Sequence, residues 1–377
     1  MTSSVRVGFL GAGLIATYHS KSLRRGGAAV ERAGVYDPDA QRSAAFSAAS
    51  GHTVCASEND VLDTCDAVYV CTWTSEHPRL VAAAAQRGVH VFCEKPLATD
   101  LIGAERMTQL VAQSGIVNQV GLVLRHSPAF RFAKLLIDDP AAGDVMSVVF
   151  RDDQFIPVQG HYGSSWRVDR SRAGAGTLLE HSIHDVDLLR WLVGDIHSVS
   201  AHTANHHGHE GIEDVAVSTM RFGNGSLGTL TSVWHDNLAR PSLRRIEIFC
   251  QRRHIVVDGD DWIGPVSWTD SDGSGGTLVG DSLHAHLATN APANAHADTN
   301  ADTNADTNGN AHANAHANDN PDVEFIRAIL DERPASPDFA VALRAHQVVD
   351  AMYRSADADG TAIIVPRVAR SADVSDI

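Results

Sequence analysis

The segment from Gly11 to Ala16, G-A-G-L-I-A, fits the pattern G-x-G-x-x-A and separates an apolar run at residues 5–10 from a helical stretch at residues 14–25. In such a turn the first Gly permits a tight bend, the second lets a pyrophosphate approach the backbone, and the small last residue allows close helix–strand packing. The helix N-terminus would face the phosphates. We therefore expect a dinucleotide-binding turn formed by Gly11, Gly13, Leu14, Ile15 and Ala16. A glycine turn in an unrelated α/β domain is the alternative.

Asp37 ends the next strand-like run, at residues 33–36. An acidic residue about 20 positions beyond the glycine turn accepts hydrogen bonds from the adenosine ribose hydroxyls. Pro38 and Asp39 follow it, so no adjacent cation would receive a 2′-phosphate. The expected cofactor is NAD, and NADP is the less favoured alternative.

Lys95 follows the strand-like run at residues 89–93, and the chain contains only two other lysines, Lys21 and Lys134. Arg serves as the cation elsewhere, so a retained Lys indicates a specific use: Lys can release a proton, and Arg in a protein cannot. A solvent-exposed cation at a strand end is the alternative.

Residues 91–96, V-F-C-E-K-P, resemble the E-K-P signature of the glucose-fructose oxidoreductase, inositol dehydrogenase and rhizopine-catabolism family, Gfo/Idh/MocA. The resemblance covers nearly the whole chain. It includes His19 after the glycine turn and the segment from Cys71 to His77, which is similar to C-T-P-x-x-x-H. It also includes Gly121 to Arg125, which is similar to a V-G-F-x-x-R strand, and Trp166-Arg167 before a Gly-rich turn.

The most specific segment is Gly174 to Asp187, which resembles G-G-G-x-L-x-D-x-G-x-H-x-x-D, the motif that carries the family's acid–base residues. The chain departs from the family pattern at three positions. Trp73 replaces Pro, Glu180 replaces Asp, and Ser182 replaces Gly. The first change bears on the nicotinamide pocket, and the second on the reach of the substrate-side carboxylate.

Oxidation of a secondary alcohol requires hydride loss, a base for the hydroxyl proton and a positive charge near the developing alkoxide. The resemblance implies that Lys95 and His184 fill the last two roles, with Glu180 as a third catalytic residue. On a continuous helix over residues 178–192, Glu180, His184 and Asp187 would share one face because they are spaced i, i+4, i+7. A structural histidine is the alternative for His184.

The resemblance also implies supporting roles for neighbouring motif residues. Expected cofactor contacts beyond the glycine turn are Thr72, His77, Glu94 and Lys95. Expected substrate contacts are Arg125, Trp166, Arg167, Glu180 and Asp187. An interdomain salt bridge is the alternative for Arg125, and a core Trp with a surface Arg is the alternative for Trp166 and Arg167.

The length of 377 residues favours two domains. Alternating strands and helices in residues 1–123 predict an α/β Rossmann domain with a doubly wound parallel sheet. Longer strand-like runs within residues 124–377, with the turn G-N-G-S at 223–226, predict an α+β substrate and oligomerisation domain with a large, mainly antiparallel or mixed open sheet. Residues from about 284 to 320 are low in complexity, so we expect a disordered insertion there.

The composition argues against two classes of partner, nucleic acid and membrane. A formal net charge of −16 and the absence of a Lys/Arg run argue against nucleic acid. No apolar run approaches the ~20 residues of a membrane helix, and no signal peptide is recognisable. Five cysteines without a C-x-x-C pair favour a reducing compartment, and we expect a cytoplasmic protein. The histidines near residues 202–209 lie in a polar loop, so we expect no metal site.

These patterns favour an NAD-dependent oxidoreductase that transfers hydride to or from a CH-OH group of a sugar, sugar derivative or inositol. Two alternatives stay open. One is a family member with tightly held nicotinamide, such as a sugar–sugar oxidoreductase or a redox-assisted glycosidase. The other is a non-catalytic NAD-binding sensor, against which Lys95 and His184 argue. The resemblance implies a homodimer or homotetramer.

Overall fold

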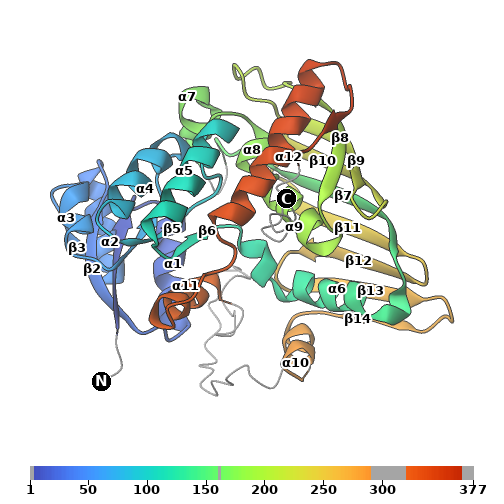
Figure 1. The fold of residues 1–377 in the computed structure, drawn as a ribbon, viewed down its shortest axis with the longest axis horizontal. Coiled ribbons are helices and arrows are strands. Elements are labelled where there is room, and N and C mark those ends of the chain that lie inside the picture. The colour runs from blue at the N-terminus through green and yellow to red at the C-terminus, as the bar shows by residue number, and fades with distance from the viewer. Residues whose placement is uncertain (1–3, 160–162, 290–319, 367–377) are drawn as a thin grey trace, which may run out of the picture.

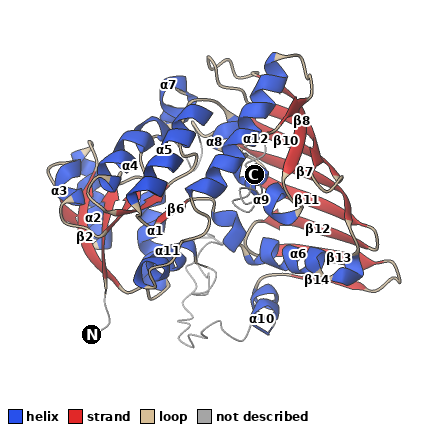
Figure 2. Ribbon diagram, viewed as in Figure 1, coloured by secondary structure: helices blue, strands red, loops and turns tan. Residues whose placement is uncertain are grey.

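The computed structural model describes residues 4–159, 163–289 and 320–366. Two sheets lie at opposite ends of the molecule, with helices between them and around the first sheet (Figures 1 and 2). This arrangement confirms the predicted class, a Rossmann domain followed by an α+β domain.

The first sheet has six parallel strands in the order β3-β2-β1-β4-β5-β6. Its strands are β1 (Val5–Leu10), β2 (Val30–Tyr36), β3 (Thr53–Val54), β4 (Ala67–Val70), β5 (His90–Cys93) and β6 (Asn118–Val120). Its helices are α1 (Leu14–Arg25), α2 (Ala40–Ser50), α3 (Glu58–Leu62), α4 (His77–Ala85) and α5 (Leu101–Ser114). Asp39 and Asp100 cap α2 and α5 by accepting backbone N–H groups, which stabilises each start by about 1 kcal/mol.

The second sheet has nine strands in the order β14-β13-β12-β11-β7-β10-β9-β8-β15. Only β7 and β10 pair in parallel, so the sheet is mixed. Its strands are β7 (Val145–Phe155), β8 (Ile196–Ala204), β9 (Val215–Phe222), β10 (Leu227–His235), β11 (Leu243–Cys250), β12 (Arg253–Asp260), β13 (Gly264–Asp270), β14 (Gly275–Leu278) and β15 (Ile363–Ile364). The predicted turn at residues 223–226 joins β9 to β10.

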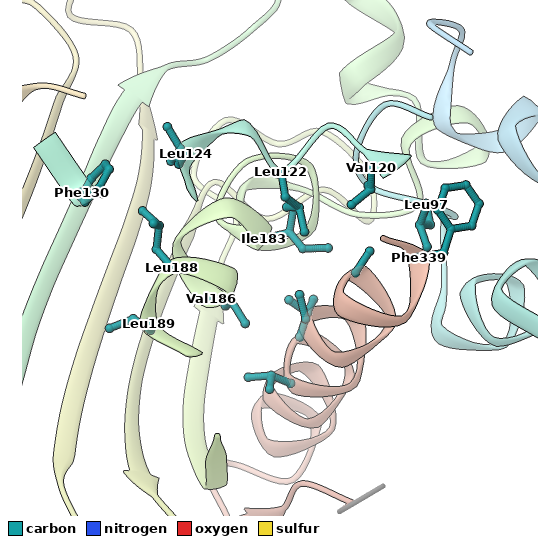
Figure 3. Close-up of a cluster of buried hydrophobic side chains, with 14 of the residues drawn as sticks. Leu97, Val120, Leu122, Leu124, Phe130, Ile183, Val186, Leu188, Leu189 and Phe339 are labelled. Carbon is teal, nitrogen blue, oxygen red and sulfur yellow. The ribbon is translucent and has the colours of Figure 1, made fainter. Parts of the chain in front are cut away.

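The remaining helices are α6 (Pro128–Asp138), α7 (Arg170–Ala173), α8 (Thr177–Glu180), α9 (Ile183–Leu192), α10 (Asp281–Thr289), α11 (Pro321–Leu330) and α12 (Phe339–Asp357). Helices α6, α9 and α12 lie on the face of the second sheet that points toward the first domain (Figure 2). Figure 3 shows Val186, Leu188 and Leu189 of α9 packed among apolar side chains. Leu122 and Leu124 come from the segment between β6 and α6, and Phe339 comes from α12. One continuous core therefore joins the two domains.

The chain after residue 320 returns to the first domain, which corrects the expected boundaries. Helix α11 contacts α1, and Phe325 and Ile326 are buried in one cluster with Phe9 of β1. Pro337 accepts a hydrogen bond from the backbone N–H of Val120. The segment 321–337 thus belongs to the first core rather than to a second domain spanning 124–377.

Three local predictions were wrong in part. The expected helix over residues 178–192 is broken at His181 and Ser182, whose N–H groups both bond to the carbonyl of Thr177. Residues 123–126 form a 3-10 helix rather than a continuation of a strand. Helix α10 runs through Thr289 and buries Leu283 and Leu287, so the expected disordered insertion does not begin at residue 284. The rest of the expected insertion, 290–319, lies outside the described residues.

Candidate functional site

The glycine turn is held between two strand ends. Gly11 has φ +91°, and an added Cβ would lie 2.4 Å from the carbonyl oxygen of Cys71. Asp37, at the end of β2, accepts hydrogen bonds from the backbone N–H groups of Ala12 and Asp39, both at 2.9 Å. Asp37 therefore fixes the turn as well as standing at the position expected to receive the ribose.

The surroundings of the turn fit a dinucleotide. An added Cβ on Gly13 would meet no atom within 4 Å, so this position faces open space. Leu14 and Ile15, at the start of α1, are 45% and 37% exposed, whereas Ala16 is fully buried against the core. Two exposed aliphatic side chains beside an open helix N-terminus are available to cover a bound cofactor.

Lys95 follows β5 and connects the two domains. Its Nζ atom donates a hydrogen bond to the backbone carbonyl of Glu180 at the end of α8. Burial lowers the pKa of Lys95 more than the negative charge of Glu180 raises it. A lysine whose pKa is lowered by burial releases its proton more readily than an exposed lysine.

Glu94, the residue before Lys95, is fixed by a buried charge network. Its Oε1 lies 3.0 Å from Nε2 of His19, and Nδ1 of His19 lies 2.7 Å from Oδ1 of Asp322 on α11. Burial disfavours the charged ring, but the two carboxylates outweigh it and raise the pKa of His19 to about 10. The other Glu94 oxygen accepts the N–H of Lys95 at 3.2 Å. Glu94 thus orients the backbone at Lys95.

The side chain of Glu180 lies close to Lys95. Thr74, directly after Trp73, donates to Glu180 Oε1 at 2.6 Å, and Arg167 Nε lies 3.5 Å from Oε2. Burial raises the pKa of Glu180 more than the positive charges of Lys95 and Arg167 lower it. The longer Glu side chain is therefore accommodated by Thr74 and Arg167.

His184 lies near Lys95 and is half-buried. Its Nδ1 atom is buried and has no hydrogen-bond partner among the described residues. Burial, followed by the positive charges of Lys95 and Arg244, lowers the pKa of His184 well below its usual value. The ring is neutral at pH 7 and is able to accept a proton. A buried ring nitrogen without a partner among the described residues is a candidate hydrogen-bonding atom for a ligand.

Three residues that were expected to bind ligands have partners inside the protein. Arg125 and Asp187 form a bidentate ion pair with distances of 2.7 and 2.6 Å, so each satisfies the other. Substrate binding by these two residues stays a prediction, and the pair is not the interdomain salt bridge considered for Arg125, because both residues lie within the predicted domain 124–377. The ring nitrogens of His77 face the carbonyl oxygens of Pro96 and Thr72, at 2.9 and 3.4 Å. Burial lowers the pKa of His77, so its ring is neutral at pH 7 and donates a single N–H to one of these carbonyls, and a contact of His77 with the cofactor stays a prediction.

Two Trp–Arg pairs lie in the segments around Glu180. The guanidinium of Arg172 on α7 stacks 3.8 Å from the ring centroid of Trp73, which lies between Thr72 and Thr74. Arg167 lies 4.8 Å from the ring centroid of Trp166. The Trp73–Arg172 contact joins the first domain to the second, so the Trp that replaces the family Pro has an interdomain partner.

Sequence reasoning missed several residues that shape the site. Glu213 accepts the N–H groups of Gly176 and Leu178, at 2.8 and 2.9 Å, and so fixes the start of α8. His181, Asp152, Asp185 and Arg244 form a buried cluster at the break between α8 and α9. Asp152 and Arg244 come from β7 and β11 and Glu213 from the loop before β9, and no local pattern marks these three; His181 and Asp185 lie within the motif segment, but their contacts with Arg244 arise only in the fold.

His206, His207 and His209 lie in a loop that is held by Asp214. His207 Nδ1 lies 2.6 Å from Asp214 Oδ2, which also accepts the backbone N–H groups of His206 and His207. Within residues 4–159, 163–289 and 320–366, no group of three or more His, Cys, Asp or Glu side chains is arranged to hold a metal ion. In the same ranges, no helix has the length and apolarity required to cross a bilayer.

Two family models match the chain. A model described as an oxidoreductase family with an NAD-binding Rossmann fold matches residues 5–122, and a model described as the GFO/IDH/MocA C-terminal domain matches residues 130–256. Together they cover more than half of the chain.

Curated relatives and solved structures are similar to this chain. It is 33% identical over 193 residues to the 1,5-anhydro-D-fructose reductase of Ensifer adhaerens, covering 49% of this chain and 56% of the relative. It is 28% identical over 229 residues to an inositol 2-dehydrogenase of Cereibacter sphaeroides, covering 59% and 65%. The alignments thus span less than two thirds of these relatives. A levoglucosan dehydrogenase solved with NADH and levoglucosan superposes with a TM-score of 0.82 at 21% identity, covering 97% of this chain and all of that one, which shows a shared fold.

Substitution of the two turn glycines separates folding from cofactor binding. Gly11→Ala should lower the melting temperature, because a side chain at φ +91° is strained and its Cβ would clash with Cys71. Gly13→Ala should leave the melting temperature unchanged and weaken NADH binding at least about tenfold, since a methyl group would occupy the space for the pyrophosphate. Thermal melting and fluorescence titration measure the two effects. Unchanged NADH affinity in Gly13→Ala would contradict the assignment of the turn.

Proposed function

The chain belongs to the Gfo/Idh/MocA oxidoreductase family, and we propose that it is an NAD-dependent dehydrogenase or reductase for a secondary alcohol or carbonyl of a sugar, sugar derivative or inositol. The observation that carries the proposal is the meeting of Lys95, Glu180 and His184. Lys95 lies at the carboxyl end of a central strand, where ligands of such sheets bind, and it bonds to the backbone of Glu180. The names of the similar proteins support a polyol or sugar substrate.

Each residue has a role that follows from its surroundings. Bound NAD would supply the hydride acceptor, held over Gly11 to Ala16 with Asp37 toward the ribose. The neutral ring of His184 takes the proton of the substrate hydroxyl, and its Nδ1 atom has no hydrogen-bond partner among the described residues. The ammonium of Lys95 stabilises the developing alkoxide. Glu180, whose Oε2 lies 3.5 Å from Arg167 Nε, accepts a hydrogen bond from a neighbouring substrate hydroxyl.

Substrate and cofactor are identified by direct assay. A panel of inositols, aldoses and keto-sugars is incubated with NAD(H) or NADP(H), and absorbance of the reduced nicotinamide is followed. We expect stoichiometric NADH release with a cyclic polyol or sugar and a preference for NAD. Turnover of a sugar without NADH release would favour a retained nicotinamide instead. No turnover across the panel, combined with tight NADH binding, would favour the sensor alternative.

The catalytic assignment is tested by three substitutions. His184→Ala and Lys95→Met should each lower kcat by at least ~100-fold, the lower range for acid–base catalysis. NADH affinity should change little in His184→Ala, since the glycine turn is intact. Lys95→Arg retains the charge but not the geometry or the removable proton, so it should also be impaired. Lys134→Met on α6 serves as a control, because Lys134 pairs only with Asp138 on its own helix. Near-normal kcat in His184→Ala and Lys95→Met would exclude these roles.

We also propose a homo-oligomer formed through the uncovered face of the nine-stranded sheet, in a cytoplasmic protein. No helix among the described residues covers this face in Figure 1, and Val149 of β7 and Val217 of β9 are each 45% exposed on it. A broad, partly apolar sheet face is typical of a subunit interface. The cysteines are all free and mostly buried, which supports a reducing compartment.

Charged residues on this face should therefore dissociate the assembly. The double variant Val149→Lys/Val217→Lys should elute as a monomer with light scattering, because desolvating two charges in an interface is unfavourable. Ile102→Lys is the control, since Ile102 is likewise exposed apolar surface but lies on α5 of the first domain. A wild-type monomer, or an oligomer unaffected by the double variant, would refute this interface.

A further inference from the structure

A buried cluster of charges lies beneath the break between α8 and α9. Arg244 of β11 places its Nε 3.1 Å from Asp152 of β7 and 2.9 Å from Asp185 of α9. Its Nη1 bonds to Asp261 in the turn between β12 and β13. Its Nη2 lies 3.0 Å from Nε2 of His181, and the same nitrogen lies 2.7 Å from Asp152 Oδ2. One guanidinium thus serves three carboxylates and an imidazole.

The charges in this cluster do not balance if every carboxyl group is ionised. Asp152 and Asp185 are 2% and 0% exposed, and their carboxyl groups lie within hydrogen-bond reach of each other. Two buried carboxylates in contact repel, and the usual resolution is that they share one proton. Oδ2 of Asp185 is buried and accepts no hydrogen bond from the described residues, as expected for an oxygen that carries the proton.

The electrostatic surroundings support the same state. Burial, and then the charge of Asp152, raise the pKa of Asp185 to about 8, although Arg244 and His181 oppose this. Asp261 and Asp153 add further negative charge near Asp152. His181 is neutral, because burial and the positive charges of Arg244, Lys95 and Arg167 lower its pKa well below the usual value. The remaining proton therefore belongs to the pair of carboxyl groups.

The cluster is connected to the candidate site through the backbone. His181 follows Glu180 directly, and its carbonyl accepts the N–H of His184 at 3.3 Å. Asp185 follows His184. On the other side of the break, Ser182 donates to Ser232 at 2.6 Å. The cluster thus holds His181, which follows Glu180, and Asp185, which follows His184.

We propose that Asp152 and Asp185 share a single proton, and that this proton lets Arg244 hold His181 so that the helix break presents Glu180 and His184 to the substrate. Asp152, Asp185, Arg244 and His181 are positioning residues in this proposal. It rests on the proposed function for its kinetic consequence, but the shared proton can be measured without any substrate.

Loss of the proton gives a pH dependence of defined sign. The folded state keeps a proton that the unfolded chain releases near the ordinary Asp value of 3.8, and it holds this proton up to about pH 8. Its contribution to stability is therefore fully present below pH 3.8 and falls as pH rises through about 8. Above that pH the pair carries two charges, and Arg244 and His181 are expected to shift. kcat should then fall on the alkaline side with little change in KM.

The kinetic test compares Asp185→Asn with Asp185→Ala. The amide of Asn resembles the protonated acid, since it is neutral and donates to Asp152, so kcat at pH 7 should stay within about threefold of wild type. The alkaline fall in kcat should be absent in this variant. Asp185→Ala removes one of the three carboxylates on Arg244 and the carboxyl group beside Asp152, so it should lower kcat at least about tenfold at pH 7. Arg244→Met should behave like Asp185→Ala, and Arg244→Lys should recover part of the loss.

Arg253→Met is the matched control. Arg253 is a buried arginine of β12 that also bridges two carboxylates, Asp139 and Asp270, but it has no contact with His181. It should lower the melting temperature without changing the alkaline limb of kcat. If Arg253→Met removes that limb, or if Asp185→Asn keeps it, the proposal is wrong. Loss of kcat at pH 7 in Asp185→Asn as large as in Asp185→Ala would also overturn it.

A substrate-free readout separates this proposal from the proposed function. The melting temperature of Asp185→Asn relative to wild type, measured from pH 5 to 9, should increase with pH, because only wild type loses a stabilising proton in that range. A constant difference would refute the shared proton. If the assay panel yields no turnover while this difference rises, the proposed function fails and the shared proton stands.

Discussion

The hydrogen bond from the ammonium of Lys95 to the backbone carbonyl of Glu180 is the interaction on which the site depends. It joins the carboxyl end of β5 in the parallel sheet to the short helix α8 of the second domain. The bond forms only when the two domains are in contact, because Lys95 belongs to the first domain and Glu180 to the second. Lys95 and Glu180, two of the proposed catalytic residues, therefore meet only while the two domains keep their relative placement.

Two features keep that placement. The apolar core is continuous from Leu97 and Val120 of the first domain to Ile183 and Val186 of α9, as Figure 3 shows. The contact between the domains is therefore packed with apolar side chains. Helix α12 also contacts both domains, since it packs against α5 of the first and against β8 and α9 of the second. Within the first domain, Asp322 of α11 reaches His19, which in turn binds Glu94 beside Lys95. Removing one member of such a buried network leaves an unpaired charge, at a typical cost of about 3–5 kcal/mol.

Local patterns predicted the parts of the fold that local chemistry determines. The glycine turn, the bounds of β1 and α1, and the turn between β9 and β10 follow from residue types within a few positions. The break at His181 and Ser182 could not be predicted this way, because no Gly or Pro marks it. Side chains from β7, β10 and β11 bind these two residues and override the helical periodicity of residues 178–192. The Arg125–Asp187 pair was missed as a pair for the same reason, since its members are far apart in sequence.

The same distinction applies to the site. Lys95, Glu180 and His184 lie in motifs, whereas Glu213, Asp152 and Arg244 act through contacts that only the folded chain creates. The most direct test of the whole arrangement is hydride transfer itself. A polyol or sugar that the enzyme turns over is prepared with deuterium at the carbon that is oxidised, and the NADH formed is examined by mass spectrometry. The account predicts that the deuterium is recovered in NADH. Its appearance in water, with unlabelled NADH, would contradict direct transfer at a site where Lys95, Glu180 and His184 hold the substrate against the nicotinamide.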